Sequence, residues 1–225
     1  MKTIGIIGAM PSELADLRND LGEAQIEKYA SYEFYINEFD GKKIINVCCG
    51  VAKVNSAIAT QILITKYNVD CVINTGIAGG MNTDIKVCDI VIANEVMHHD
   101  VTTRFLENYP PFCGHYHADE KLIEMAEKAC DKNGYKHFKG RIVSGEQFIS
   151  DDTVKASIVT EFSPYAVDME SASIGHCCYR NGTPFATIRC ISDNADHDGD
   201  ISFEEFGIIA AKRNADVVLT MIKDM

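Results

Sequence analysis

Short runs of β-branched and other apolar residues alternate with amphipathic segments along most of the chain. The run TIGIIGA at 3–9 has no polar face, which is typical of a strand buried on both sides. The Asp40–Gly41 pair lies between two strand-like runs and is a hairpin signal. Taken together, the apolar runs predict strands at 3–9, 32–39, 43–49, 71–76, 87–96, 140–145, 165–169 and 185–192.

Helical patterns fill several of the intervals between these strands. Pro11 suits the first position of a helix because its φ angle is fixed, and residues 53–67 have a helical pattern. A helix at 119–134 is expected to bury Leu122, Ala126, Ala129 and Cys130 and to end at Gly134.

Residues 203–223 are expected to close the chain as a helix. The side chains expected on its inner face are Phe206, Ile209, Ala210, Val217 and Met221. Alternation of strands and helices predicts an α/β fold in which helices cover a sheet, and no linker or repeat divides the chain. We therefore expect one domain over residues 1–225.

Residues 98–117 have no clear period and are predicted to form a long functional loop. The segment Tyr109-Pro110-Pro111-Phe112 within it suggests an apolar wall or a subunit contact. His98-His99-Asp100 and His115-x-His117 carry metal-ligating groups, but no further Cys/His pair follows at a fixed spacing. Surface or pocket-lining histidines are the favoured interpretation, and no metal site is predicted.

Composition excludes several classes of partner. The chain has 225 residues and a formal net charge of −12, which disfavours nucleic acid and anionic membranes as main partners. No apolar stretch approaches the roughly 20 residues of a membrane span, and the N-terminal run meets acidic residues too early for a signal peptide. The nine cysteines form no CxxC pair, so we expect free thiols in a reducing cytoplasm.

Acidic and glycine residues follow the predicted strands. Glu13 follows the first strand, GIAGG (76–80) follows another, and Glu170, Arg189 and Asp193 follow or end later ones. Ligands of open α/β sheets bind at the carboxyl ends of the strands, so these groups are expected to converge. Each of these features also has a purely structural interpretation: the carboxylates could stabilise or cap the start of a helix, and the glycines could form a tight turn. However, a carboxylate beside an apolar strand is costly unless it is paired or has a function.

The segment NADHDGDISFEEF (194–206) partly matches a calcium-binding EF-hand loop, with Gly199 at the turn position and Glu205 at the bidentate position. However, its first position is Asn194 rather than aspartate, and a strand-like run precedes it instead of a helix. A loop that follows a functional strand is therefore favoured over a calcium site.

Six ordered segments resemble the bacterial 5′-methylthioadenosine/S-adenosylhomocysteine nucleosidases of the purine nucleoside phosphorylase-like superfamily. They are IGIIGAM (4–10) with Glu13, INTGIAGG (73–80), VCDIVIA (87–93), IVSGEQFI (142–149), VDMESASI (167–174) and RCISDNAD (189–196) with ISFEEF (201–206). The resemblance covers essentially the whole chain. It implies a three-layer αβα fold with a twisted mixed sheet, a homodimer and no cofactor.

The resemblance also implies roles for individual residues. Asp193 is similar to the general acid at purine N7, Glu13 to the group that activates water, Glu170 to the ligand of the ribose hydroxyls, and Arg189 to the residue that positions Glu170 and the water. The expected substrate-binding residues are Ile77, Ala78 and Gly79 beside the nucleoside, Phe148 and Ile149 at the base, Met169 at the ribose and Phe203 at the 5′ group.

The chemistry of the reaction fits these residue types. Cleavage of an N-glycosidic bond places positive charge on the ribose and electron density on the leaving base, so carboxyl groups are needed on both sides of the bond. Asp193 must arrive protonated, which burial or neighbouring carboxylates favour. The related phosphorylases carry one arginine near the position of Glu13 and a second arginine at the position of Asn74. The absence of both arginines favours water over phosphate as the nucleophile.

Three departures from the family pattern leave alternatives open. Ile77 replaces a usual serine, Asp168 stands where glutamate is common, and residues 98–117 differ from the usual sequence. A hydrolase for another purine nucleoside, including a futalosine-like one, and a phosphorylase are the alternative enzymes. A nucleoside- or calcium-binding module without catalysis is the alternative from another class.

Overall fold

The computed structural model describes the backbone of residues 1–195 and 199–225 and the side chains of residues 1–195 and 206–225. The helices and strands follow one another along the chain as β1 (Thr3–Gly8), α1 (Pro11–Leu21), β2 (Gln25–Tyr29), β3 (Tyr32–Phe39), β4 (Lys42–Cys48), α2 (Lys53–Tyr67), β5 (Cys71–Gly80), β6 (Ile90–His98), α3 (Thr103–Asn108), β7 (Tyr116–His117), α4 (Glu120–Asn133), β8 (His137–Ser144), α5 (Asp152–Phe162), β9 (Ala166–Asp168), α6 (Ser171–Asn181), β10 (Phe185–Asp193) and α7 (Gly199–Asp224).

The central sheet is mixed and partly closed on itself. Its order is β10-β6-β8-β9-β5-β1-β4-β3-β2, and β10 also pairs with β5. The strands β5, β10, β6, β8 and β9 therefore form a ring, while β1, β4, β3 and β2 extend from β5 as an open sheet. Because β1, β4, β5 and β10 run parallel, their carboxyl ends meet at one edge.

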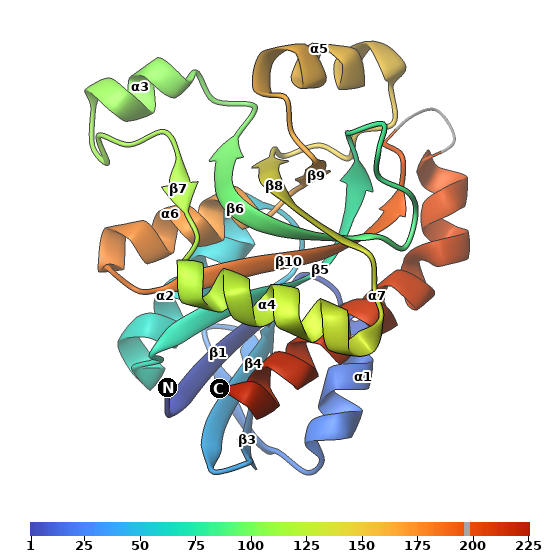
Figure 1. Ribbon diagram of the computed structural model, residues 1–225. Coiled ribbons are helices and arrows are strands. Elements are labelled where there is room, and N and C mark those ends of the chain that lie inside the picture. Colours follow the sequence, from blue (N-terminus) through green and yellow to red (C-terminus); the bar gives the residue numbers. More distant parts are fainter. Residues whose placement is uncertain (196–198) are drawn as a thin grey trace.

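Helices cover both faces of this sheet. On one face, α7 packs against α1, α4, β5 and β10, and on the other α2 packs against α6 (Figure 1). The predicted αβα architecture with a twisted mixed sheet is confirmed, whereas the ring closure was not predicted. The sequence pattern does not show closure because the β10–β5 pairing joins segments more than a hundred residues apart.

Strands β5 and β10 are buried along their whole length, although they contain several polar residues. The amide of Asn214, on α7, donates hydrogen bonds to Thr75 Oγ1 (2.7 Å) and to the carbonyl oxygen of Ile188 (2.8 Å). Asn214 is fully buried. It therefore fixes α7 to both strands and satisfies polar groups that would otherwise be costly to bury.

Two sequence predictions about elements are wrong. The strand expected at 87–96 begins at Ile90, because Cys88 adopts a positive φ of 71° in a turn before it. The segment 98–117 is not one loop, since it contains α3 and β7. No residue of α3 is buried, so its sequence has no hydrophobic period, and β7 is defined by pairing with β6.

The inner face of the last helix also differs from the prediction. Ala210, Val217 and Met221 are buried as expected, and Phe206 is half-buried, but Ile209 is 49% exposed. The four predicted core residues of α4 are buried, and Gly134 caps that helix in the left-handed conformation.

The described residues include no helix that is both long and apolar enough to cross a membrane. All nine cysteines are free thiols, as expected. Five of them are buried, namely Cys49, Cys71, Cys130, Cys178 and Cys190.

Asn214→Ala is expected to lower the free energy of unfolding by about 2 kcal/mol, because it leaves the Ile188 carbonyl and the Thr75 hydroxyl buried without their partner. Urea denaturation monitored by circular dichroism measures the change. Lys212→Ala, on the exposed side of the same helix, is the control and is expected to stay within about 0.5 kcal/mol of the wild type. Equal losses in the two variants would contradict the role of Asn214.

Candidate active site

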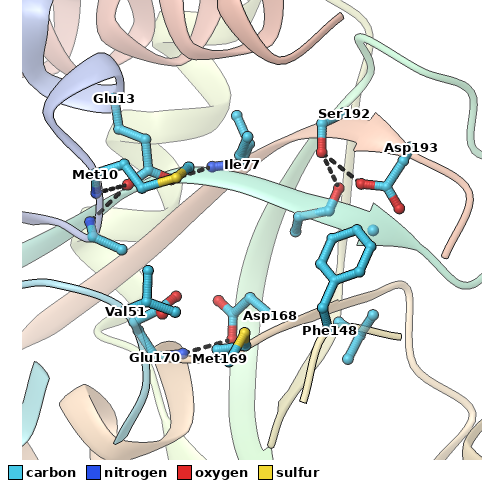
Figure 2. A pocket seen from close by; sticks show the side chains of 14 residues that line it. Met10, Glu13, Val51, Ile77, Phe148, Asp168, Met169, Glu170, Ser192 and Asp193 are labelled. Atoms are coloured by element: carbon cyan, nitrogen blue, oxygen red, sulfur yellow. Dashed lines mark hydrogen bonds between the residues drawn. The ribbon is translucent and has the colours of Figure 1, made fainter. Parts of the chain in front are cut away.

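A cavity of about 260 Å³ opens at the edge where the strand ends meet. Its walls come from the segments that follow β1, β4 and β8 and from the ends of β5, β9 and β10 (Figure 2). The lining residues are Ala9, Met10, Glu13, Val51, Ile77, Ala78, Gly79, Phe148, Val167, Asp168, Met169, Glu170, Ser192 and Asp193.

Glu13 is held by three backbone N–H groups. Pro11 begins α1, and the carboxylate of Glu13 turns back so that Oε2 accepts hydrogen bonds from the N–H groups of Ala9 (2.6 Å) and Met10 (2.9 Å). Its Oε1 accepts from the N–H of Ile77 (3.0 Å). With only 2% of its surface exposed, Glu13 is a buried carboxylate at the cavity wall, not a solvated first-turn glutamate.

Arg189 lies at the centre of a buried group of charges. It is fully buried, and its guanidinium contacts Asp168 (Nε to Oδ2, 2.8 Å), Glu170 (Nη2 to Oε2, 3.3 Å) and Glu13 (Nη1 to Oε1, 3.6 Å). A Cβ atom at Gly76 would collide with both Arg189 and Glu13. Glycine at this point of β5 is therefore what lets the arginine and the glutamate approach each other.

The charges of these groups depend on one another. Burial raises the pKa of Glu170, Arg189 lowers it, and the nearby Asp168 raises it again, which leaves the pKa at about 7. For Arg189, burial lowers the pKa, but the carboxylates of Asp168, Glu13 and Glu170 outweigh burial and raise it. Arg189 therefore remains a cation, whereas Glu170 changes its charge near neutral pH.

Asp193 lies across the cavity from this cluster. It ends β10 and is almost fully buried. Its Oδ1 accepts a hydrogen bond from the N–H of Ala195 (2.7 Å), and its Oδ2 pairs with the Ser192 hydroxyl (2.7 Å). Figure 2 shows Asp193 and Phe148 at one end of the cavity and Glu13 and Glu170 at the other. The cavity thus has a carboxyl group at each end.

Most of the predicted substrate-binding residues line this cavity. Ile77, Ala78 and Gly79 form one wall, and Phe148 and Met169 contribute side chains. Ile149 lies beside the cavity rather than in its wall, because its buried side chain belongs to a small apolar cluster with Val143 and Val167. The Phe203 side chain lies outside the described residues, as does most of the EF-hand-like segment.

Other lining residues were missed or undervalued in the sequence. Met10 and Val51 follow β1 and β4, so the rule that ligands bind after parallel strands already pointed to their segments. In the sequence, Asp168 stands out only as a departure from a family pattern, although it accepts the closest hydrogen bond of Arg189.

The histidines of 98–117 do not form a metal site in the described part of the chain, where no three His, Cys, Asp or Glu residues are gathered as metal ligands. His98 is neither a surface nor a pocket-lining residue, since it is buried beside Tyr116 and His176. Burial lowers the pKa of His98 to about 4, so the ring is neutral at neutral pH.

Comparison with known proteins connects this geometry to one family. Residues 3–223 match the family model described as the phosphorylase superfamily. The 5′-methylthioadenosine/S-adenosylhomocysteine nucleosidase of Bacillus subtilis is 40% identical over 98% of both chains, and that of Actinobacillus succinogenes is 38% identical over 99% of both.

Solved structures agree with the sequence comparison. The 5′-methylthioadenosine/S-adenosylhomocysteine nucleosidase of Neisseria meningitidis, solved in complex with methylthio-immucillin-A, has a TM-score of 0.95 and is 37% identical, with both chains fully covered. The futalosine hydrolase of Helicobacter pylori has a TM-score of 0.94 at 28% identity and covers 100% of this chain and 98% of its own.

Glu170→Gln is expected to raise the melting temperature of the ligand-free protein more at about pH 8 than at about pH 5. At the higher pH the variant removes a buried negative charge, whereas at the lower pH the wild-type carboxyl is already neutral. Because the raised pKa means that the folded state binds the proton more tightly than the unfolded chain, the cost of Glu170 grows as the pH rises from about 4.5 through about 7.

Scanning calorimetry at the two pH values measures this difference. Glu124→Gln, at an exposed position of α4, is the matched control and is expected to change neither melting temperature appreciably. A gain from Glu170→Gln that is the same at both pH values would contradict the buried-charge argument.

Proposed function

Because the chain belongs to the phosphorylase superfamily, and within it to the family of 5′-methylthioadenosine/S-adenosylhomocysteine nucleosidases, we propose that it hydrolyses the N-glycosidic bond of 5′-methylthioadenosine and S-adenosylhomocysteine. The products are adenine and the corresponding 5-thioribose. The observation that carries the proposal is the position of Asp193 at one end of the cavity, opposite Glu13, Glu170 and Arg189 at the other.

The proposed reaction uses the two ends of the cavity differently. At the Asp193 end, the protonated carboxyl gives its proton to N7 of the base as the C1′–N9 bond breaks and the bonding electrons move to the purine. At the opposite end, Glu13 accepts a proton from water, whose oxygen forms the new bond to C1′. Positioned proton transfers of this kind each contribute about 10²–10⁴-fold to a rate.

Glu170 and the apolar walls position the nucleoside in this proposal. The carboxylate of Glu170 binds the ribose hydroxyls, with Met169 against the sugar. Phe148 and the backbone of Ile149 contact the base, and Ile77, Ala78 and Gly79 lie along the nucleoside. Phe203 is proposed for the 5′ pocket on the family resemblance alone. These apolar side chains exclude bulk water, which strengthens the electrostatic interactions inside the site.

The charges of the site favour water over phosphate as the nucleophile. No lysine or arginine lines the cavity among the described residues, and the buried Arg189 already contacts three carboxylates. A phosphate dianion would therefore meet Glu13, Glu170 and Asp193 without an available cation, whereas neutral water would not be repelled. Hydrolysis is for this reason preferred to phosphorolysis.

A futalosine hydrolase is the second candidate function. The fold similarity to the enzyme of Helicobacter pylori is nearly as high as the similarity to the nucleosidases. The relatives that are 37–40% identical are nucleosidases, which favours the nucleosidase. The base and 5′ group that the cavity accepts distinguish the two.

Release of the free purine base in phosphate-free buffer is the direct test, with 5′-methylthioadenosine as the first substrate and S-adenosylhomocysteine, adenosine and futalosine in parallel. We expect rapid release from the first two, no change on adding phosphate and no ribose 1-phosphate product. Activity that requires phosphate would establish a phosphorylase instead, and turnover of futalosine alone would establish the second candidate. Thermal stabilisation by the nucleoside without any product would indicate a binding module.

Asp193→Asn and Glu13→Gln are each expected to lower kcat by roughly 10²–10⁴-fold, because each removes a proton transfer. Circular dichroism and the Kd for 5′-methylthioadenosine, measured on the same preparations, show whether the fold and the site persist. Asp152→Asn, at the start of α5 and away from the cavity wall, is the control and is expected to keep wild-type kcat. Wild-type turnover in Asp193→Asn or Glu13→Gln would remove the role assigned to that residue.

We further propose that residues 1–225 act as one cytoplasmic catalytic domain in a homodimer. The dimer is supported by large apolar side chains that are more than half exposed on α2 and around α3: Val54, Phe105, Tyr109 and Phe112. Light scattering measures the mass in solution, and a monomer at micromolar concentration would contradict this part of the proposal. The acidic net charge gives no support to nucleic-acid binding.

A further inference from the structure

We propose that Asp168 is a positioning residue, which holds Arg189 and Glu170 in one fixed arrangement and places its own carboxylate beside Glu170. The inference rests on the proposed hydrolysis, because it gives that reaction a residue that acts only through its neighbours.

Asp168, Arg189 and Glu170 are joined in a closed ring of hydrogen bonds. Asp168 Oδ2 accepts from Arg189 Nε (2.8 Å), and Arg189 Nη2 donates to Glu170 Oε2 (3.3 Å). The ring closes where the backbone N–H of Glu170 donates to Asp168 Oδ1 (3.3 Å). One carboxylate therefore orients Glu170 from two directions, through its main chain and through the arginine that contacts its side chain.

The carboxylate of Asp168 has no capacity left for a substrate. Its Oδ1 also accepts hydrogen bonds from the Ser144 hydroxyl and from the N–H of Ser171 (3.1 Å), and its Oδ2 also accepts from the Ser171 hydroxyl. An ionised carboxylate offers about four acceptor positions, and these donors occupy them. The Asp168 side chain is 2% exposed, so it acts through Arg189 and Glu170 rather than on the nucleoside.

Rigid elements hold the donors that surround Asp168. The Ser144 hydroxyl, at the end of β8, accepts a hydrogen bond from the N–H of Ala172 (2.8 Å). The Ser171 hydroxyl accepts from the buried amide of Asn74 on β5 (2.8 Å). The position of Asp168 is thus fixed from β5, β8 and α6 together, which is the supporting arrangement that a catalytic group requires to stay within its productive geometry.

The charge of Asp168 bears on Glu170 together with its other neighbours. Arg189 from β10 and Glu13 from α1 face Glu170, as does the buried Cys49 just after β4, whose raised pKa keeps the thiol neutral. The N–H of Ala52 donates to Glu170 Oε1 (2.9 Å). After burial, which is the largest effect on the pKa of Glu170, Asp168 raises this pKa against the opposing effect of Arg189. Removing the negative charge of Asp168 should therefore lower the pH at which Glu170 ionises.

The test compares Asp168→Asn with two matched variants over a pH range of about 5 to 9, with adenine release from 5′-methylthioadenosine as the readout. The ionised carboxylate of Glu170 accepts hydrogen bonds from the ribose hydroxyls more strongly than the neutral carboxyl does, so kcat/KM of the wild type is expected to fall on the acid side as Glu170 gains a proton. In Asp168→Asn we expect this fall to move about one pH unit lower, and kcat to drop about 10²-fold as the ring opens.

The matched variants separate charge from structure. Ser171→Ala removes a donor to Asp168 but keeps the charge, and Asp168→Glu keeps the charge on a longer side chain. Both are expected to leave the acid-side fall of kcat/KM where the wild type has it, and Asp168→Glu is expected to recover most of the kcat that Asp168→Asn loses. An acid-side fall that does not move in Asp168→Asn, even if stability and kcat decline, overturns the proposal.

A second measurement needs no turnover and so separates this proposal from the proposed function. Glu170→Gln is introduced into the wild type and into Asp168→Asn, and melting temperatures are recorded against pH. The gain from Glu170→Gln is expected to begin near pH 4.5 in both backgrounds, but in Asp168→Asn it should level off about one pH unit lower and at a smaller value than in the wild type. The same levelling pH and the same gain in both backgrounds overturn the inference. If Asp168→Asn does not fold, Asp168→Ser, which is smaller and also neutral, is measured in the same way with the same expectation.

Discussion

The burial of the Arg189 guanidinium is the constraint on which the site depends. Removing a cation from water costs several kcal/mol unless close counter-charges and hydrogen bonds replace the solvent. Arg189 is fully buried, and it meets this requirement with Asp168, Glu170 and Glu13, which come from two distant segments of the chain. The buried guanidinium in turn orients each of these carboxylates. The contacts that compensate the charge of Arg189 are therefore the same contacts that set the geometry of the site.

The ring in the sheet is what allows those segments to meet. Because β10 pairs with β5 on one side and with β6 on the other, Arg189 in the middle of β10 is enclosed by strands. Strand β9 is short, and its antiparallel contact with β5 through Gly79 and Gly80 brings Asp168 toward the same point. An open sheet of the same strands would leave the ends of β9 and β10 at different edges. The fold therefore creates the buried environment that gives Glu170 its raised pKa.

Much of the site could be predicted from the sequence, because its charged residues stand at the ends of predicted strands. Glu13, Glu170, Arg189 and Asp193 each follow or end an apolar run, and the rule for strand ends predicted their convergence. The main omission was Asp168, whose importance comes from its hydrogen bonds to Arg189, Ser144 and Ser171 rather than from its place in a motif. In the fold, α3 and β7 are not predicted because neither buries a periodic face, and the prediction for Ile209 is wrong because its side chain is half exposed on α7.

The sequence by itself determined the α/β class, most of the strands, the core faces of α4 and much of α7, and the family, because these depend on local hydrophobic periods and on ordered motifs. Only the tertiary structure decided the closure of the ring, the three-carboxylate environment of Arg189 and the ionisation of Glu170 near neutral pH. The physical reason is that desolvation and Coulomb energies depend on distances between segments far apart in the chain. Periodicity records which side of an element is buried, but it does not record which charged group lies opposite.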